Sequence, residues 1–106
     1  MVVTIKTEEE WNEIVKDNKH VLVDFFAQWC GPCKAIAPKF IDLSNAYPEI
    51  AFVKIDIEVD ALKGLVDKFG ISSLPTFILL EDAQVKGKQV GADITKIQAL
   101  IDLAKA

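Results

Sequence analysis

The sequence predicts one α/β domain, covering residues 1–106, with a central mixed sheet of five strands flanked by four helices on both faces. Short apolar segments alternate with amphipathic ones through the first half of the chain, which is typical of strands that alternate with helices. Two further strands joined by a short connection precede the last helix, so the sheet contains an antiparallel pair. With 106 residues, 51% of them hydrophobic, the chain can fill one core but not two.

The first elements are a strand, a helix and a second strand. Residues 2–6 are expected to form the first strand. Thr7 begins a capping box that ends at Glu10, in which each side chain accepts the backbone N–H of the other residue and so starts a helix. Residues 21–27 are apolar apart from one acid, which indicates a strand buried on both faces.

The middle of the chain is expected to contain a long helix, a strand and a short helix. The long helix begins near Cys30, and Pro38 is expected to kink it because proline removes one backbone hydrogen bond. Residues 51–57 form the third strand, and residues 62–69 the short helix. Gly70 ends that helix, since glycine accepts the left-handed conformation common after a helix.

A hairpin and a final helix complete the expected fold. Residues 76–80 and 85–90 are the last two strands, and residues 81–84 connect them. Asp93 is a good N-cap for the last helix. The inner face of that helix is expected to comprise Ile94, Ile97, Leu100, Ile101 and Ala104.

The charge balance excludes several classes of function. All 12 basic residues are lysines, and with 16 acidic residues the net charge is −4, which argues against nucleic acid as the main partner. Without arginine, bidentate recognition of phosphate or carboxylate is not expected. No apolar run approaches the length of a membrane span, and the first residues lack the pattern of a secretory signal.

Both cysteines lie in one five-residue motif, Trp29-Cys30-Gly31-Pro32-Cys33. The motif follows an apolar strand and opens a helix, so Cys30 is expected at the helix N-terminus and next to solvent. Free N–H groups and the macrodipole favour a thiolate there. Cys33 lies one turn later on nearly the same face, shielded from solvent. We therefore assign Cys30 as the nucleophile and Cys33 as the resolving thiol of a pair that opens and closes in redox exchange.

Two other residues of the motif are expected to support this exchange. Pro32 suits the first helical turn, where its missing N–H costs nothing and its φ is already set. Trp29 is expected to shield the dithiol and to add flat apolar contact area.

A zinc half-site is the alternative interpretation of two cysteines at this spacing. Zinc usually has four ligands in proteins, and His20 is the only further soft ligand, expected in solvent at the start of a strand. The two cysteines also staple too little chain for a secreted disulfide scaffold. We therefore expect no metal, and a catalytic pair in a reducing compartment.

Asp24 interrupts the apolar run and is the second candidate site residue. An unpaired carboxylate within an apolar strand is costly, so we expect a raised pKa, a partner, or both. Asp24 could accept the proton of Cys33 when that thiol attacks a mixed disulfide. Lys54, in a neighbouring apolar strand, can offset the charge of Asp24 if the two strands pair. The alternative is that Asp24 faces outward at a strand end.

These residues stand in a sequence that resembles the thioredoxin family over essentially the whole chain. The W-C-G-P-C core and its flanking segments match the family, and the downstream segments follow in the same order and spacing. The matching segments are residues 23–27 (VDFFA), 34–38 (KAIAP), 53–56 (VKID), 74–76 (LPT) and 90–92 (VGA). The resemblance implies the thioredoxin fold.

The resemblance also implies a client-binding surface beside the dithiol. It implies that Pro75 follows a cis bond, in a loop that faces the dithiol and leaves the Leu74 backbone free to pair with an extended client segment. Gly91 would allow close backbone approach there, or is an ordinary turn glycine. The substrate-binding residues expected in this way are Trp29, Leu74, Pro75, Thr76, Gly91 and Ala92, and the redox-tuning residues are Gly31, Pro32 and Lys54.

The function implied by the resemblance is protein-disulfide reduction in cell redox homeostasis. Reduced Cys30 would attack a client disulfide, and Cys33, assisted by Asp24, would release the client and leave a Cys30–Cys33 disulfide. A flavin-dependent thioredoxin reductase would restore the dithiol with electrons from NADPH. Typical clients of the family are ribonucleotide reductase, peroxiredoxins and methionine sulfoxide reductases. The chain itself is expected to bind no cofactor and to be a cytoplasmic monomer without nucleic-acid or membrane partners, with an organelle as the open alternative location.

Two other functions compete with this one. Oxidases and isomerases of the same fold usually carry a histidine between the cysteines, and Gly31-Pro32 lacks that charge, which favours the reducing direction. A binding subunit without redox activity needs neither cysteine nor Asp24, whereas this chain keeps them. A scaffold role in addition to the enzymatic one stays open.

The sequence departs from the family pattern in three places. Phe26 stands where a tryptophan is common, which we expect to change fluorescence more than chemistry. Asp82-Ala83 replaces the frequent Asn-Gly hairpin turn, and since alanine does not readily accept positive φ, the type of turn stays open. No cysteine lies outside the motif, so regulation through additional thiols is not expected.

Overall fold

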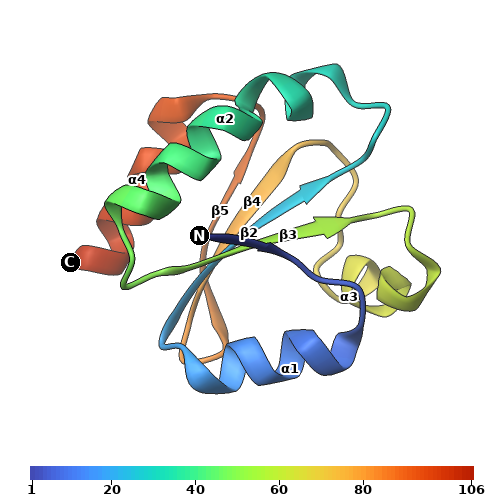
Figure 1. The fold of residues 1–106 in the computed structure, drawn as a ribbon, viewed down its shortest axis with the longest axis horizontal. Coiled ribbons are helices and arrows are strands. Elements are labelled where there is room, and N and C mark those ends of the chain that lie inside the picture. The colour runs from blue at the N-terminus through green and yellow to red at the C-terminus, as the bar shows by residue number, and fades with distance from the viewer.

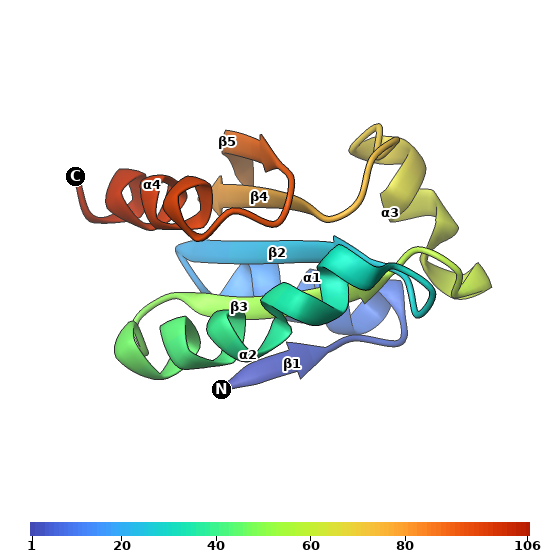
Figure 2. The ribbon, with the colours of Figure 1, turned by 90° about the horizontal axis from the view of Figure 1, so that it is seen from above.

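The strands form one five-stranded mixed sheet in the computed structural model, which describes residues 1–106. The strand order is β1-β3-β2-β4-β5, as Figure 2 shows from β1 to β5. β3 pairs parallel with β1 and β2, whereas β4 pairs antiparallel with β2 and β5. In chain order the elements are β1 (Val2–Thr4), α1 (Glu8–Asp17), β2 (His20–Phe26), α2 (Gly31–Ala46), β3 (Ala51–Asp56), the 3-10 helix η1 (Asp60–Leu62), α3 (Lys63–Lys68), β4 (Thr76–Glu81), β5 (Gln84–Val90) and α4 (Ile94–Lys105).

Helices cover both faces of the sheet, as predicted. Figure 1 shows α1 and α3 on one side of the strands and α2 and α4 on the other. Side chains alternate along β2: Val23 and Phe25 pack with Trp11 of α1, whereas Leu22 packs with Phe40 of α2. Beyond its first residue β2 is buried, so the predicted strand with two covered faces is confirmed.

The helix ends follow the predicted capping chemistry. Thr7 and Glu10 form the capping box at the start of α1. Asp93 caps α4 by accepting the Thr95 N–H at 2.9 Å. Pro38 lies inside α2, and the helix changes direction along its length in Figure 1, as expected where one backbone hydrogen bond is missing.

Three predictions about single elements are corrected. β1 ends at Thr4, two residues earlier than predicted. The predicted short helix is divided into η1 and α3, while Gly70 closes it with a φ of +62°, as expected. Ile94 at the start of α4 is 37% exposed and does not belong to the inner face of that helix.

His20 does not lie free in solvent as predicted. It begins β2, directly beside Glu81 at the end of β4. The His20 Nε2 and Glu81 Oε1 atoms are 2.8 Å apart, and the Lys86 ammonium lies 2.9 Å from the same oxygen. These contacts join β2, β4 and β5 at the end of the sheet opposite the cysteines.

The β4–β5 turn takes the conformation that its sequence disfavours. Glu81 and Gln84 pair across it, so the loop has two residues, Asp82 and Ala83. Their φ values are +51° and +66°, which is the pattern of a type I′ turn. The strand twist therefore determines the turn, and Ala83 bears the steric cost of a left-handed residue with a Cβ.

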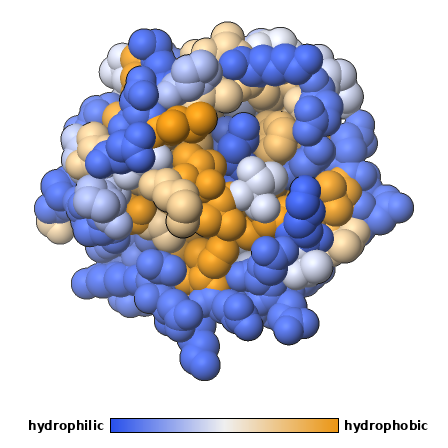
Figure 3. Space-filling view, in the orientation of Figure 1, coloured by the Kyte–Doolittle hydropathy of each residue, from blue (hydrophilic) through white to orange (hydrophobic).

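Apolar side chains that belong to the core or pack against it also reach the surface at the β1 edge. Figure 3 shows them in the centre of one face, between α1 and the α2–α4 side, with hydrophilic residues around them. A hollow of about 250 Å³ there is lined by residues that include Val3, Ile14 and Phe52, at the end of the sheet away from the cysteines. None of the helices combines the length and the apolar composition that a membrane span requires.

Candidate active site

The candidate site lies at the end of the sheet where β2, β3 and β5 finish and β4 begins. The strand register places Phe26 beside Asp56, and Thr76 beside Val90. β2 runs directly into the loop before α2, so the same edge receives both cysteines. The carboxyl ends of parallel strands are the usual location of sites in open α/β sheets.

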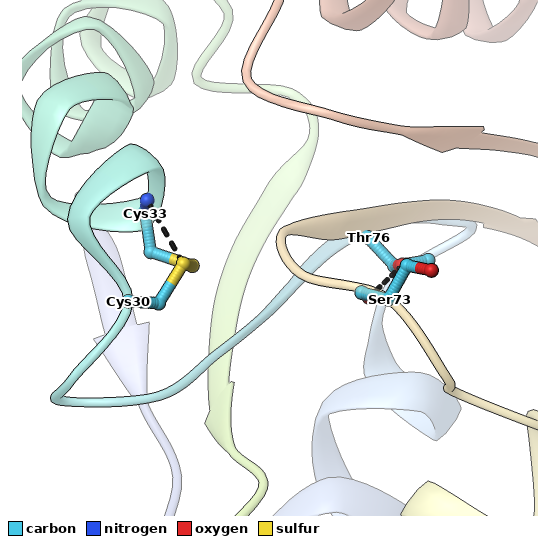
Figure 4. The surroundings of a disulfide bond; sticks show 4 residues. All are labelled: Cys30, Cys33, Ser73 and Thr76. Atoms are coloured by element: carbon cyan, nitrogen blue, oxygen red, sulfur yellow. Dashed lines mark hydrogen bonds between the residues drawn. A yellow bond between two sulfur atoms is a disulfide. The ribbon is translucent and has the colours of Figure 1, made fainter.

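Cys30 and Cys33 form a disulfide at the N-terminus of α2 (Figure 4). Cys30 is the N-cap of the helix, and its Sγ accepts the backbone N–H of Cys33 at 3.2 Å. In the reduced protein the same N–H and the positive end of the helix dipole would favour a thiolate on Cys30. The predicted position of Cys30 at the helix N-terminus is confirmed, and the structure represents the oxidised state.

The prediction that Cys30 lies next to solvent is wrong for this state. Cys30 is 5% exposed and Cys33 3% exposed. Both cysteines form a cluster with Phe26 and Ala27, and half-buried Leu74 packs against it. The two cysteines are therefore buried to a similar extent, and the N-cap position of Cys30 is what distinguishes them.

The loop before β4 lies against the disulfide. The bond between Leu74 and Pro75 is cis, in agreement with the resemblance. Figure 4 shows the turn that holds Ser73 and Thr76 on the other side of the disulfide from α2. Neither the N–H nor the C=O of Leu74 makes a backbone hydrogen bond within the chain. Both groups are therefore available to an extended segment from outside.

The other residues expected to bind clients differ in what they present. Thr76 is 1% exposed, and its hydroxyl donates to the Ser73 carbonyl oxygen at 2.6 Å, so its side chain closes the turn and faces no client. Gly91 has a φ of +107° and donates its N–H to the Pro75 carbonyl oxygen at 2.9 Å. This contact requires a conformation that suits glycine. Ala92 is exposed.

Trp29 lies in solvent beside the β3 end of the sheet. Its side chain is 67% exposed, and its indole Nε1–H donates to Glu58 Oε1 at 2.8 Å. Glu58 in turn donates its backbone N–H to Asp56 Oδ1 at 2.9 Å. The sequence analysis missed Glu58, although its place two residues after β3 puts it at the same sheet edge as the cysteines.

Asp24 is buried in the sheet below this edge. It is 0% exposed, and neither carboxylate oxygen has a hydrogen-bond partner. Burial raises the pKa of Asp24 from 3.8 to about 7, and the positive charge of Lys54 lowers it in part. The outward-facing alternative is thereby excluded, and the predicted buried carboxylate is confirmed.

Lys54 stands directly beside Asp24 in the β2–β3 register, as predicted. Its ammonium does not pair with the carboxylate; Nζ lies 4.3 Å from the centroid of the Phe26 ring. Lys54, Phe26 and Cys33 line one cavity of about 290 Å³. The ammonium therefore acts on Asp24 through space, and Lys54 shares a cavity with Cys33.

This arrangement suits electron-pair transfer between sulfur atoms. The N-terminus of α2 favours a thiolate on Cys30, and burial gives Asp24, in the strand that leads to the cysteines, a pKa of about 7. No group of three or more His, Cys, Asp and Glu side chains is arranged to hold a metal ion.

Comparison with known proteins gives one consistent result. The family model described as Thioredoxin matches residues 2–104. Thioredoxin-1 of Schizosaccharomyces pombe is 43% identical over 101 residues, which cover 95% of this chain and 96% of that protein. Thioredoxin-2 of Pyricularia oryzae is 44% identical over 93 residues, 88% of this chain, and the match spans about half, 53%, of that longer protein.

The solved structures agree with the sequence matches. The crystal structure of a poplar thioredoxin h superimposes with a TM-score of 0.88 at 39% identity, covering 98% of this chain and 96% of that chain. The similarity therefore includes the whole fold as well as the motif.

Proposed function

Because the chain belongs to the thioredoxin family, we propose that its Cys30–Cys33 pair carries two electrons from a reductase to disulfides in client proteins. Thiol–disulfide oxidoreductase activity, as a protein-disulfide reductase, follows from the family and the cysteine pair. The parts of the single residues and the identity of the partners are what we propose. The disulfide at the N-terminus of α2 is the observation that carries the proposal.

The proposed reaction has two exchange steps. The Cys30 thiolate attacks one sulfur of the client disulfide, forms a mixed disulfide and releases the other client sulfur as a thiolate. Cys33 then loses its proton and attacks the Cys30 sulfur, which forms the intramolecular disulfide and releases the second client thiolate. The client gains two electrons and two protons, and the dithiol of the chain is oxidised.

Asp24 is the proposed acceptor of the Cys33 proton. It lies two residues before Phe26 on the same face of β2, and Phe26 packs in the cluster that holds Cys33. Two strand residues span roughly 7 Å, so the proton moves over a short path, directly or through one water molecule. A pKa of about 7 suits an acceptor that must release the proton again near neutral pH.

Clients are proposed to bind as an extended segment along the loop before β4. The free N–H and C=O groups of Leu74 would form hydrogen bonds with the client backbone, as an added strand does. The exposed Trp29 ring and Ala92 would flank the segment with apolar contact. Gly91 supports the surface through its hydrogen bond to Pro75. Gly31 and Pro32, both exposed and uncharged, would keep the potential of the pair in the reducing range.

The proposed partners are an NADPH-dependent flavin thioredoxin reductase and disulfide-bearing clients. Ribonucleotide reductase, peroxiredoxins and methionine sulfoxide reductases are the candidates to test first. The cytoplasm is the proposed location, with an organelle as the alternative, because a reducing dithiol works where thiols are kept reduced.

Reduction of insulin coupled to NADPH oxidation by a thioredoxin reductase tests the proposed function. The chain is expected to catalyse NADPH consumption and insulin precipitation. The Cys30→Ser variant is expected to be inactive, since no thiolate remains at the helix N-terminus. A chain that is reduced by the reductase but leaves insulin intact would contradict client reduction.

A further inference from the structure

The side chain of Lys54 makes no hydrogen bond with the carboxylate of Asp24, its neighbour in the sheet. The two residues are direct neighbours in the parallel β2–β3 register, so their side chains start from the same face of the sheet. An ion pair between them would give the buried Asp24 a partner, yet both of its oxygens have none. The Lys54 ammonium instead lies 4.3 Å from the centroid of the Phe26 ring.

Phe26 has the position and the chemistry to hold that ammonium. It follows Asp24 by two residues on the same face of β2 and is only 9% exposed, fixed in the cluster with Cys33. A lysine ammonium within about 6 Å of an aromatic centroid is attracted by the negative face of the ring. Phe26 and Lys54 both line the cavity beside Cys33.

We propose that Phe26 is a positioning residue: its ring holds the Lys54 ammonium in the cavity beside Cys33, close to the buried Asp24 but not paired with it. A direct ion pair would stabilise the charged carboxylate strongly and make it a weak proton acceptor. An ammonium lost to solvent would leave the carboxylate without any offset. The ring prevents that loss, because it holds the ammonium on the side of Asp24. The importance of the Lys54 charge for catalysis rests on the proposed role of Asp24 as proton acceptor. The contact between the Phe26 ring and the Lys54 ammonium does not depend on that role.

The other ionisable groups on this side of the sheet leave Lys54 as the main charge acting on Asp24. Cys33 and Lys34 of α2 line the same cavity, and Asp56 follows Lys54 by two residues on β3. The other charged residues of α2 and α4, which are Lys39, Asp42, Lys96, Asp102 and Lys105, are exposed. Asp56 is engaged by the Glu58 N–H at 2.9 Å and the Gln28 amide at 3.4 Å. β4 places Phe77 beside Asp24, and the buried residues of α4 are Ile97, Leu100 and Ile101.

A double-mutant cycle on the oxidised protein tests the inference. The cysteines do not titrate in that state, so carboxyl ¹³C NMR reports the Asp24 titration without interference. The variants are Lys54→Met, Phe26→Leu and the two combined. Any change in burial caused by Phe26→Leu occurs in both proteins of the mutant pair and cancels in the cycle. A second pair with Phe26→Trp is the matched control, since tryptophan is the strongest cation–π partner.

Lys54→Met is expected to raise the Asp24 pKa in the parent, because it removes the attractive charge. In the Phe26→Leu background this rise is expected to fall by roughly half or more, since doubling the charge separation halves the Coulomb energy. With Phe26→Trp the full rise is expected to return. An equal rise with Phe26→Leu would show that the ring does not hold the ammonium. A larger rise would show that the ring keeps the ammonium away from Asp24, which also overturns the proposal.

Two further measurements keep the test decisive. Amide NMR spectra establish that each variant is folded, and Phe26→Met, also apolar and not aromatic, replaces Phe26→Leu if that variant does not fold. Single-turnover client reduction against pH then separates this inference from the proposed function. A cycle with the expected result and rates that ignore the Asp24 pKa would refute the proton role alone. Rates that follow the Asp24 pKa and a cycle without coupling would refute the positioning role alone.

Discussion

Replacing Asp24 by asparagine is expected to change the pH dependence of folding stability. The variant keeps the shape of the side chain and removes its titration. Asp24 is fully buried, and its pKa in the folded protein is about 7 compared with an ordinary value of 3.8. The folded state therefore holds the proton more tightly than the unfolded state, so ionisation of Asp24 destabilises the fold.

The size of the effect follows from the two pKa values. The cost is absent below the unfolded pKa of 3.8, grows as pH rises and is complete above about 7. At about 1.4 kcal/mol per pKa unit, roughly 1.5 kcal/mol is present at pH 5 and roughly 4 kcal/mol at pH 8. The unfolding free energy of Asp24→Asn relative to the parent is thus expected to rise by roughly 2.5 kcal/mol over this range.

Urea melts of the oxidised proteins at pH 5, 6, 7 and 8 provide the measurement. The buried asparagine amide also lacks a hydrogen-bond partner, at a cost of about 1–3 kcal/mol that is the same at every pH. The change with pH of the difference in unfolding free energy between variant and parent is therefore diagnostic, whereas its absolute value is not. Asp42→Asn, which changes an exposed carboxylate of α2, is the matched control and is expected to follow the parent. A difference between Asp24→Asn and the parent that stays constant from pH 5 to 8 would refute the raised pKa.

Three further predictions concern the two cysteines and two residues with positive φ, Ala83 and Gly91. In the reduced protein iodoacetamide is expected to label Cys30 faster than Cys33, because the N-cap thiolate accepts the Cys33 N–H; peptide mapping over time measures this, and equal rates would contradict it. Ala83→Gly is expected to stabilise the fold by about 1 kcal/mol, since the φ of +66° costs glycine nothing; an unchanged urea midpoint would argue against the strain. Gly91→Ala is expected to destabilise the fold and slow client reduction, because a Cβ opposes its φ of +107° and weakens the hydrogen bond to Pro75; parent-like melting and turnover would contradict that view.

The fold was predictable where local chemistry and hydrophobic period agree. Thr7, Glu10 and Asp93 act within one helical turn of their own chain, so their caps could be identified without any tertiary contact. The burial of Asp24 was predictable because its neighbours along the strand are apolar on both sides. The position of Cys30 followed from a strand that leads directly into a helix.

The contacts that could not be predicted join residues far apart in the chain. The Trp29–Glu58 hydrogen bond and the His20–Glu81 contact span 29 and 61 residues, and each depends on side-chain conformations that periodicity does not encode. The contact of Lys54 with the Phe26 ring is of the same kind. If the proposed positioning role holds, Phe26 would also affect the chemistry of the site, and the expectation that this residue changes fluorescence more than chemistry would have to be revised.

Burial in the final fold also changed two expectations about the site. Thr76 begins a strand that lies between β2 and β5, so its side chain is enclosed on formation of the sheet. Cys30 is covered in the oxidised state because Leu74, more than forty residues later in the chain, packs against its cluster. Neither effect has a signal in the local sequence.

Trapping of the mixed disulfide tests the central claim most directly. Each of the single variants Cys33→Ser and Cys30→Ser, in reduced form, is incubated with a disulfide-bonded client and analysed by intact mass and peptide mapping. Cys33→Ser is expected to accumulate a covalent adduct with the client on Cys30, because the attack proceeds but no resolving thiol releases it. Cys30→Ser is expected to form little or none. An adduct that forms on Cys33 as fast as on Cys30 would contradict the assignment of Cys30 as the nucleophile at the N-terminus of α2.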